Sequence, residues 1–413
     1  MVEVQEAIVR EIEETTNWPI VPLLIAESDF RSLLRDLYGQ AAAKVLQSEE
    51  SEEQAEPEPL HLNALLEEMV ALSASDLHLS AGLPPSVRID GAIRPLPDRD
   101  ALNASELRQL IFGILPQRDQ ERFERELELD ASHTVPDVGR FRLNVFQQRD
   151  AVGAVLRAIP FKIVPLPDLG LPPAVASLAE LPRGLVLVTG PTGSGKSTTL
   201  ASLVDIINST RPCHIMTVED PIEFLHRSKK AVVNQREVGS DTRSFADALK
   251  RVLRQDPDVI LIGELRDLET ISTALTAAET GHLVFATLHT QDAPQSVDRI
   301  IDVFPPHQQQ QVRVQLASTL QGVVTQQLLP RARTRGRAVA CEVLVTTPAV
   351  RNLIREGKNH QIYSAMQAGG QYGMQTMDAS LGALVRDGVI SLEVALEHCH
   401  NQSDLRRLAG VAA

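Results

Sequence analysis

The chain is poor in aromatic residues and carries an excess of negative charge, and both features argue against a nucleic-acid-binding protein. Only 3% of its 413 residues are aromatic, which leaves little surface on which unpaired bases could stack. Its formal net charge of −14 would repel a phosphate backbone, which is bound by basic surfaces. We therefore expect no nucleic-acid partner.

Cysteines and long apolar runs are also scarce. Cys213, Cys341 and Cys399 lie far apart and form no C-x-x-C pair. Structural zinc sites usually contain such pairs, so we predict no zinc site and reduced thiols in the cytosol. No apolar run approaches the ~18 residues that span a bilayer, and the acidic N-terminus lacks the basic region of a secretory signal. We expect a cytoplasmic protein.

The strongest pattern in the sequence is G-x-x-x-x-G-K-[ST] at residues 190–197. It lies between an apolar, strand-like segment at 185–188 and a helix-like segment at 198–207, and this strand–loop–helix setting is what a phosphate-binding loop requires. Glycines let the backbone wrap a polyphosphate, and the amides of a helix N-terminus bind it. The sequence therefore predicts binding of a nucleoside triphosphate.

Two side chains of this loop have distinct roles in the prediction. The Lys196 ammonium can reach the β- and γ-phosphates, and the Ser197 hydroxyl can ligate Mg²⁺. The alternative is a glycine-rich turn before an ordinary helix. The candidate nucleotide-binding residues of the loop are Gly190, Pro191, Thr192, Gly193, Ser194, Gly195, Lys196, Ser197 and Thr198.

Acidic residues follow two further strand-like segments. Glu219-Asp220-Pro221-Ile222-Glu223 comes after the segment 215–218, and Glu264 comes after the segment 259–262. Because α/β sheets bind ligands at the carboxyl ends of their strands, a carboxylate of the first group could activate water. Glu264 could orient Mg²⁺ or its waters. The alternative for the first group is a solvated loop with a helix cap.

Two histidines flank the fourth strand-like segment, 283–286. His282 precedes it and His289 follows it. A histidine at the end of a core strand could sense a γ-phosphate through a hydrogen bond. The alternative is a structural histidine within a polar turn.

The pattern along the chain predicts six regions. Residues 1–47 predict a small helical module, and residues 48–59 an acidic, disordered linker or a docking site for a basic partner. Residues 60–160 predict an α+β domain with an antiparallel sheet covered on one face, and the prolines of 161–173 a hinge between domains. Residues 174–345 predict a parallel α/β core, and residues 346–413 are expected to be helical.

Specific helices and strands are expected within the α+β domain. Asp90-Gly91 predicts a two-residue hairpin turn between its second and third strands. The predicted helices are 60–72, 104–114 and 118–125, and the predicted strands are 76–80, 86–89, 92–96, 127–134, 140–147 and 151–159.

Four blocks, in this order, closely resemble the type II/IV secretion ATPases, the motors of pili and secretion systems. They are GPTGSGKSTT, VEDPIEF, GELRD and ETGHLVFATLHT, and the resemblance covers about residues 60–390. It implies an α/β protein with a PAS-like N-domain followed by a RecA-like P-loop ATPase core, preceded here by the extra helical module. ATP and Mg²⁺ are the implied ligands.

The resemblance also implies roles for individual residues. Glu223 matches the catalytic base, Glu219 a supporting acid near the metal, and Glu264 the Walker B acid, while His282 and His289 match the His box. The family takes further cationic groups from the domain that precedes the core. Arg140 and Arg142 match those positions, as Arg88 and Arg157 could; exposed sheet residues are the alternative for each.

Two observations indicate a branch of the family. The zinc-binding insertion that is usual in extension and secretion motors is missing here. The segment Ala349-Val350-Arg351-Asn352-Leu353-Ile354-Arg355-Glu356 closely resembles the AIRNLIRE motif of pilus retraction ATPases, the PilT group. The resemblance implies a homohexameric motor at the cytoplasmic face of the inner membrane, with a membrane platform protein as its partner.

Other functions stay open at this point. A pilus extension or type II secretion motor is the alternative within the superfamily. A DNA translocase and a nucleotide-dependent regulatory paralogue with weak catalysis are alternatives from other classes. The retraction motors typically begin near the equivalent of Leu60, so residues 1–59 are additional and keep the regulatory alternative open.

Overall fold

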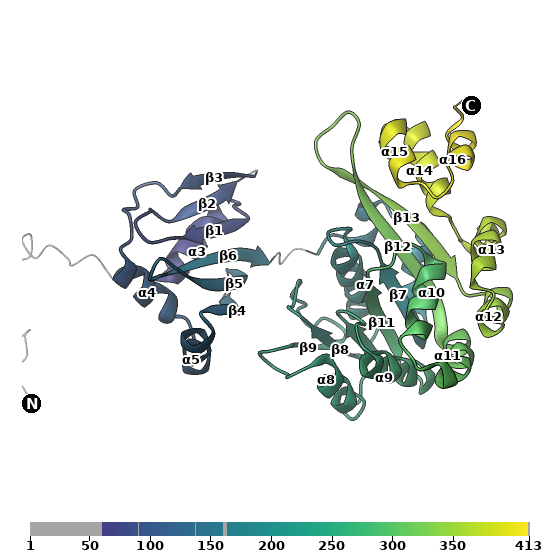
Figure 1. The fold of residues 1–413 in the computed structure, drawn as a ribbon, viewed down its shortest axis with the longest axis horizontal. Coiled ribbons are helices and arrows are strands. Elements are labelled where there is room, and N and C mark those ends of the chain that lie inside the picture. The colour runs from purple at the N-terminus through teal and green to yellow at the C-terminus, as the bar shows by residue number, and fades with distance from the viewer. Residues whose placement is uncertain (1–59, 90, 137, 160–162, 412–413) are drawn as a thin grey trace, which may run out of the picture. The chain divides into compact units, whose positions relative to one another are not determined.

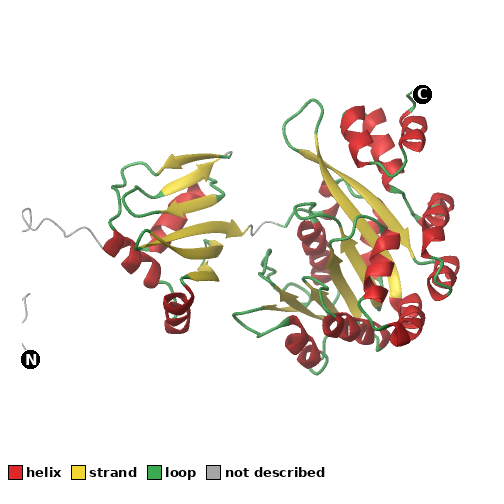
Figure 2. Ribbon diagram, in the orientation of Figure 1, coloured by secondary structure: helices red, strands yellow, loops and turns green. Residues whose placement is uncertain are grey.

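The computed structural model describes residues 60–411 apart from residues 90, 137 and 160–162. The predicted helical module 1–47 and the predicted acidic linker 48–59 therefore lie outside the described residues. Two sheets are present, each with its own helices (Figure 2). No helix of the described residues is long and apolar enough to cross a membrane.

The first sheet has six strands in the order β3-β2-β1-β6-β5-β4, and all its pairs are antiparallel. Its helices lie along one face, as predicted for this domain (Figure 1). The strands are β1 Asp76–Leu79, β2 Ser86–Ile89, β3 Ala92–Pro95, β4 Glu128–Val135, β5 Gly139–Gln148 and β6 Ala151–Ile159, and the helices are α3 Leu62–Ala71, α4 Ala104–Phe112 and α5 Gln117–Glu126.

Alternation along the strands explains why one face is covered and the other is polar. On β5, Phe141, Leu143 and Val145 are fully buried, while the intervening Arg140 and Arg142 point to the other face. Arg88, Asp76, Arg157 and Arg142 are paired in one register across β2, β1, β6 and β5, so they form a row on that polar face. Asp76 holds two members of the row, with Oδ1 2.7 Å from Arg157 Nε and Oδ2 3.7 Å from Arg88 Nε.

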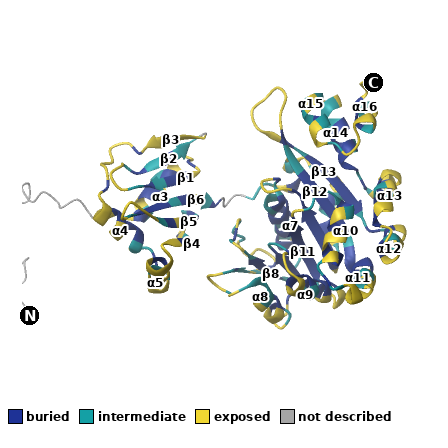
Figure 3. Ribbon diagram, viewed as in Figure 1, coloured by how far each residue is buried: buried dark blue, intermediate teal, exposed yellow. Residues whose placement is uncertain are grey.

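The second sheet has seven strands in the order β13-β12-β7-β11-β10-β8-β9, and only β13 is antiparallel to its neighbour. Every residue of β7, β10 and β11 is buried, which is why these strands are continuous apolar runs in the sequence (Figure 3). The strands are β7 Gly184–Thr189, β8 His214–Glu219, β9 Val232–Glu237, β10 Val259–Ile262, β11 Leu283–Leu288, β12 Leu320–Pro330 and β13 Arg337–Val345.

Helices cover both faces of this sheet and produce two apolar cores. On one face α7 (Lys196–Thr210) packs through Leu203, Val204 and Ile207. On the other face lie α8 Phe245–Val252, α9 Leu268–Glu279, α10 Ala293–Asp302 and α11 Pro306–Thr319. This is the predicted parallel α/β core, and β9, β12 and β13 are strands that the sequence patterns did not predict.

The proline-rich segment differs from the prediction of a hinge over residues 161–173. Residues 161 and 162 are outside the described residues, but Leu166 is buried in the core of the second sheet. The Ser202 hydroxyl of α7 donates to the Val164 carbonyl at 2.6 Å. The leucines between the prolines anchor this part of the segment, and its prolines instead begin the short helices η1 Leu166–Leu169 and α6 Pro173–Ser177.

The chain after β13 is helical, as predicted. Helix α12 (Pro348–Arg355) carries most of the AVRNLIRE segment; it buries Val350 and Ile354, and Leu353 packs beside them. The remaining helices are α13 Ile362–Ala368, α14 Met377–Arg386, α15 Leu392–His398 and α16 Gln402–Ala409.

Candidate active site

The loop between β7 and α7 is shaped by its glycines. Gly190 and Gly195 have φ values of 135° and 91°, a backbone region that other residues rarely adopt. A Cβ atom on Gly190 would also collide with the Gln326 carbonyl oxygen of β12. The neighbouring strand therefore restricts this position to glycine.

The loop fits an anionic phosphate chain. The first amides of α7 have no carbonyl partner within the helix, and the N-cap residue Gly195 has no side chain to cap them. The Ser194 hydroxyl is buried and has no hydrogen-bond partner among the described residues. Phosphate oxygens can accept hydrogen bonds from both kinds of donor.

Lys196 is 9% exposed and its ammonium donates to the Gly190 and Pro191 carbonyls at 2.8 and 3.0 Å. Burial lowers the pKa of Lys196, and the nearby carboxylates of Glu264 and Glu223 oppose that shift. Two carbonyl groups of the loop thus hold the Lys196 ammonium in place. A bound triphosphate could attract it as a stronger electrostatic partner.

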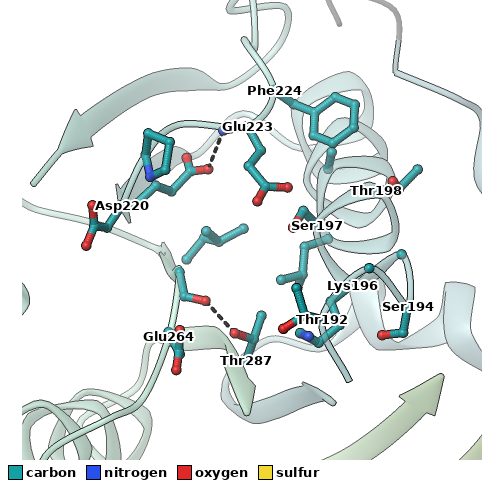
Figure 4. A pocket seen from close by; sticks show the side chains of 18 of the residues that line it. Thr192, Ser194, Lys196, Ser197, Thr198, Asp220, Glu223, Phe224, Glu264 and Thr287 are labelled. Carbon is teal, nitrogen blue, oxygen red and sulfur yellow. Dashed lines mark hydrogen bonds between the residues drawn. The ribbon is translucent and has the colours of Figure 1, made fainter. Parts of the chain in front are cut away.

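The acidic segment after β8 forms a loop with two differently placed carboxylates. Glu219 is enclosed: it accepts hydrogen bonds from the Thr217 hydroxyl at 2.6 Å and from the Glu223 amide at 3.4 Å. Burial raises the pKa of Glu219. The Glu223 carboxylate instead points into the pocket, toward the end of α7 that carries Ser197 (Figure 4). Glu223 therefore has the access that a general base needs, and Glu219 supports its loop.

Glu264 lies beyond the end of β10 between two basic side chains. Its Oε2 is 2.7 Å from Arg266 Nη2, and its Oε1 is 3.3 Å from His289 Nε2. The hydrogen bond from Arg266 lowers the pKa of Glu264 against the effect of burial. The Thr287 hydroxyl of β11 donates to the Gly263 carbonyl at 2.5 Å and joins the two strand ends.

The structure brings most of the predicted site residues to one pocket of about 400 Å³ (Figure 4). Gly190 and Pro191 are absent from its lining and contribute through their contacts with Lys196. The predicted residues that line the pocket are Thr192, Gly193, Ser194, Gly195, Lys196, Ser197, Thr198, Glu219, Glu223, Glu264 and His289.

Of the two predicted His-box residues, the structure brings His289 to this pocket but not His282. His282 precedes β11, next to Gly184 at the start of β7, whereas the phosphate-binding loop follows the end of β7. The six residues of β11 separate the two histidines by roughly 20 Å at the usual rise of a strand. The His282 ring lies 3.0 Å from the Ala277 carbonyl through Nδ1 and is a structural residue here.

The predicted arginines do not line the pocket. Arg142 is exposed in the polar row of the first sheet. Arg140 donates to the Ser132 hydroxyl at 2.6 Å and lies 3.0 Å from Glu237 Oε2. Their expected action on a triphosphate therefore stays a prediction.

Several residues that were not predicted as site residues also line the pocket. Arg337, at the start of β13, donates to the Gly193 carbonyl at 3.5 Å, and burial lowers the pKa of His226 to about 4, so its ring is neutral at pH 7. Phe224 directly follows the predicted acid Glu223, and Arg266 lies two residues after the predicted acid Glu264, so the sequence could have indicated both. The additional lining residues include Phe224, His226, Phe245, Arg266, Leu328 and Arg337.

Comparisons with known proteins identify the family of the chain. A family model described as "Type II/IV secretion system protein" matches residues 50–397. This chain belongs to that family. It is 52% identical over 334 residues to the "Type IV pilus retractation ATPase PilT" of Pseudomonas aeruginosa, covering 80% of this chain and 96% of that protein. It is also 49% identical over 321 residues to a "Twitching motility protein" of Neisseria gonorrhoeae, covering 78% and 86%.

A solved structure extends the likeness from sequence to fold. The crystal structure of the pilus retraction motor PilT with bound ADP matches with a TM-score of 0.79 at 50% identity, covering 84% of this chain and 99% of that chain. Together with the converging loop, acids and lysine, these findings identify the chain as a P-loop ATPase of the family.

Proposed function

We propose that this chain is the motor that couples ATP hydrolysis to retraction of type IV pili. The observation that carries the proposal is the convergence of Lys196, Glu223 and Glu264 on one pocket, within a chain so similar to named retraction motors. The AVRNLIRE segment on α12 supports the retraction branch, and the alternatives of extension and type II secretion are outcomes of the test below.

The residues of the pocket divide the chemistry between them. The loop amides and Lys196 bind the phosphates of ATP, and the Glu223 carboxylate takes a proton from the attacking water. His289 lines the pocket, and its Nε2 lies 3.3 Å from Glu264 Oε1. From this position its ring would respond to the γ-phosphate. Arg266 keeps Glu264 ionised for its part in the site.

The oxygen atoms of Ser197 and Glu264 are the kind of donor that Mg²⁺ prefers. The described residues contain no group of three or more His, Cys, Asp or Glu side chains that could hold a metal by themselves. Ser197, the triphosphate and water would complete the shell, with Glu264 orienting the water, as in other P-loop sites. The ion would neutralise charge that develops on the phosphates.

The motor is proposed to act as a homohexamer at the inner membrane, with a membrane platform protein as its partner. The polar row on the first sheet, which contains Arg142 and Arg157, is proposed to meet the triphosphate of a neighbouring subunit. Such an arrangement would make hydrolysis in one subunit depend on the position of the next.

A deletion strain tests the proposal. Loss of the gene should give surplus pili that do not retract and should abolish twitching, and wild-type protein should restore both. The variant Lys196→Ala should not, because losing one partner of a buried charge pair costs about 2–5 kcal/mol of binding free energy. The matched variant Lys250→Ala, at an exposed surface pair with Glu269, should restore both.

Other outcomes would point to other functions. Few pili in the deletion strain would indicate an extension motor, and unchanged pili a regulatory paralogue. ATP hydrolysis that rises on addition of DNA would instead support a translocase.

A further inference from the structure

Strand β9, at the edge of the second sheet, holds the loop that carries Glu223. The Gln235 amide group contacts that loop on both sides of Glu223. Its Nε2 donates to Glu219 Oε1 at 3.2 Å and to the Phe224 carbonyl at 2.8 Å. Its Oε1 accepts from the His226 amide at 2.8 Å. One side chain thus fixes three points of residues 219–226.

Glu237 lies two positions farther along β9 and faces the same side of the strand. It is 3% exposed, and its Oε2 accepts from the Ile222 amide at 3.0 Å. The Ser240 hydroxyl lies 3.3 Å from its Oε1. Gln235 and Glu237 therefore secure the loop from residue 219 to residue 226 through side chains of a single strand.

Glu223 is joined to this network through its backbone. Its amide lies 3.4 Å from Glu219 Oε2, and its carboxylate faces the pocket (Figure 4). The position of that carboxylate therefore depends on the loop backbone. A displacement of about 1 Å at a reacting group can cost on the order of 10²-fold in rate, so the bonds that fix the loop bear directly on turnover.

We propose that Gln235 is a positioning residue for the Glu223 carboxylate, acting through the loop backbone. The inference rests on the proposed role of Glu223 as the base. A glutamine suits the position because the amide supplies both donors and an acceptor. A carboxylate of the same size would retain the acceptor for His226 but would lose both donors and would face Glu219 with like charge.

The test is the variant Gln235→Glu in the full-length protein. At about pH 8 the turnover number for ATP should fall at least tenfold, within the range expected for a misplaced group, while the Kd for nucleotide stays within about twofold. The matched control is Asn234→Asp, the same chemical change one residue away. Asn234 is exposed and contacts His214 at 2.8 Å, so this variant should hydrolyse ATP normally.

A double-mutant cycle separates positioning from a general structural effect. Because Gln235 acts through Glu223, Gln235→Glu should add almost nothing to the loss already caused by Glu223→Gln. Independent, multiplying losses would overturn the proposal, as would turnover equal to that of Asn234→Asp. A large rise in Kd with unchanged turnover would assign Gln235 to binding and would equally contradict it.

Two further measurements keep the result interpretable. If Gln235→Glu does not fold, Gln235→Met is neutral, has a similar length and should give the same loss of turnover with normal nucleotide affinity. Full turnover in Glu223→Gln alone would refute the base assignment in the proposed function. An inactive Glu223→Gln beside a fully active Gln235→Met would refute only the present inference.

Discussion

The charged side chains of the pocket differ in whether they already have a partner within the chain. Lys196 is held by two carbonyl oxygens, and Glu264 by Arg266 and His289. Each of these charges already has a partner in the chain. The Glu223 carboxylate, by contrast, points into the pocket toward the end of α7 that carries Ser197.

The variant Glu223→Gln should bind ATP almost normally and lose about 10²-fold or more in turnover. The amide retains the size of the side chain but cannot accept the proton of the attacking water. Steady-state hydrolysis and nucleotide binding measured on the same preparation check this, with Glu393→Gln on the exposed start of α15 as the control. A rise in KM with unchanged turnover would instead assign Glu223 to binding and shift the base role to Glu219.

At the scale of secondary structure, some features of the site could be predicted from the sequence and others could not. The loop at 190–197 and the acids after β8 and β10 were predictable because each is local: a motif follows its own strand. The contacts of Gln235 could not be predicted, because they depend on the pairing of β9 with β8. The sequence of β9, VVNQRE, lacks the alternation of apolar and polar residues that indicates a strand. His282 precedes β11 and His289 follows it, so the two histidines lie at opposite ends of the strand although they belong to one motif.

The pairing of β12 with β13 buries an acid whose ionisation should affect stability. Glu342 of β13 accepts from the Ala293 amide at 2.8 Å, which caps the start of α10. Burial raises the pKa of Glu342 to about 7. The folded state therefore binds the proton more tightly than the unfolded state, so this group's contribution to stability is complete below about pH 4.5 and is lost as pH rises through 7.

The variant Glu342→Gln should remove that pH dependence. The amide mimics the protonated acid, so relative to wild type the variant should gain up to about 3 kcal/mol in free energy of unfolding at about pH 8 and almost nothing at about pH 4. Urea unfolding at both pH values measures the difference. Glu356→Gln, at a surface pair with Lys358, is the control. An equal effect at both pH values would mean that Glu342 does not titrate in this range.

At the scale of the whole molecule, the two sheets carry different functional groups. The pocket belongs to the second sheet, and the row containing Arg142 belongs to the first. Among the described residues, the loop, Lys196 and the predicted acids reach the pocket, but no arginine of the first sheet does. An arginine supplied by a neighbouring subunit is the arrangement that would complete it.

Mixing two inactive variants tests whether Arg142 acts between subunits. A chain with Arg142→Ala and a chain with Lys196→Ala should each be inactive, but mixed hexamers should regain part of the hydrolysis, since some interfaces join an intact loop to an intact arginine. A mixture of Lys196→Ala with Glu223→Gln is the control, because both residues line one pocket and no mixed site is complete. Mixed hexamers without recovered activity would assign Arg142 to its own sheet, and the same experiment applies to Arg140.

Deleting residues 1–59 should leave hexamer formation and ATP hydrolysis close to those of the intact chain. All the residues of the pocket lie between Thr192 and Arg337, and the family model matches the chain only from residue 50 onward. Hydrolysis rate and oligomer mass of a 60–413 chain, compared with the full chain, measure the effect. Any consequence should appear in cells as altered location or pilus dynamics, because a tethered segment acts by raising the local concentration of a partner. A monomeric or inactive 60–413 chain would mean that the first 59 residues are part of the motor itself.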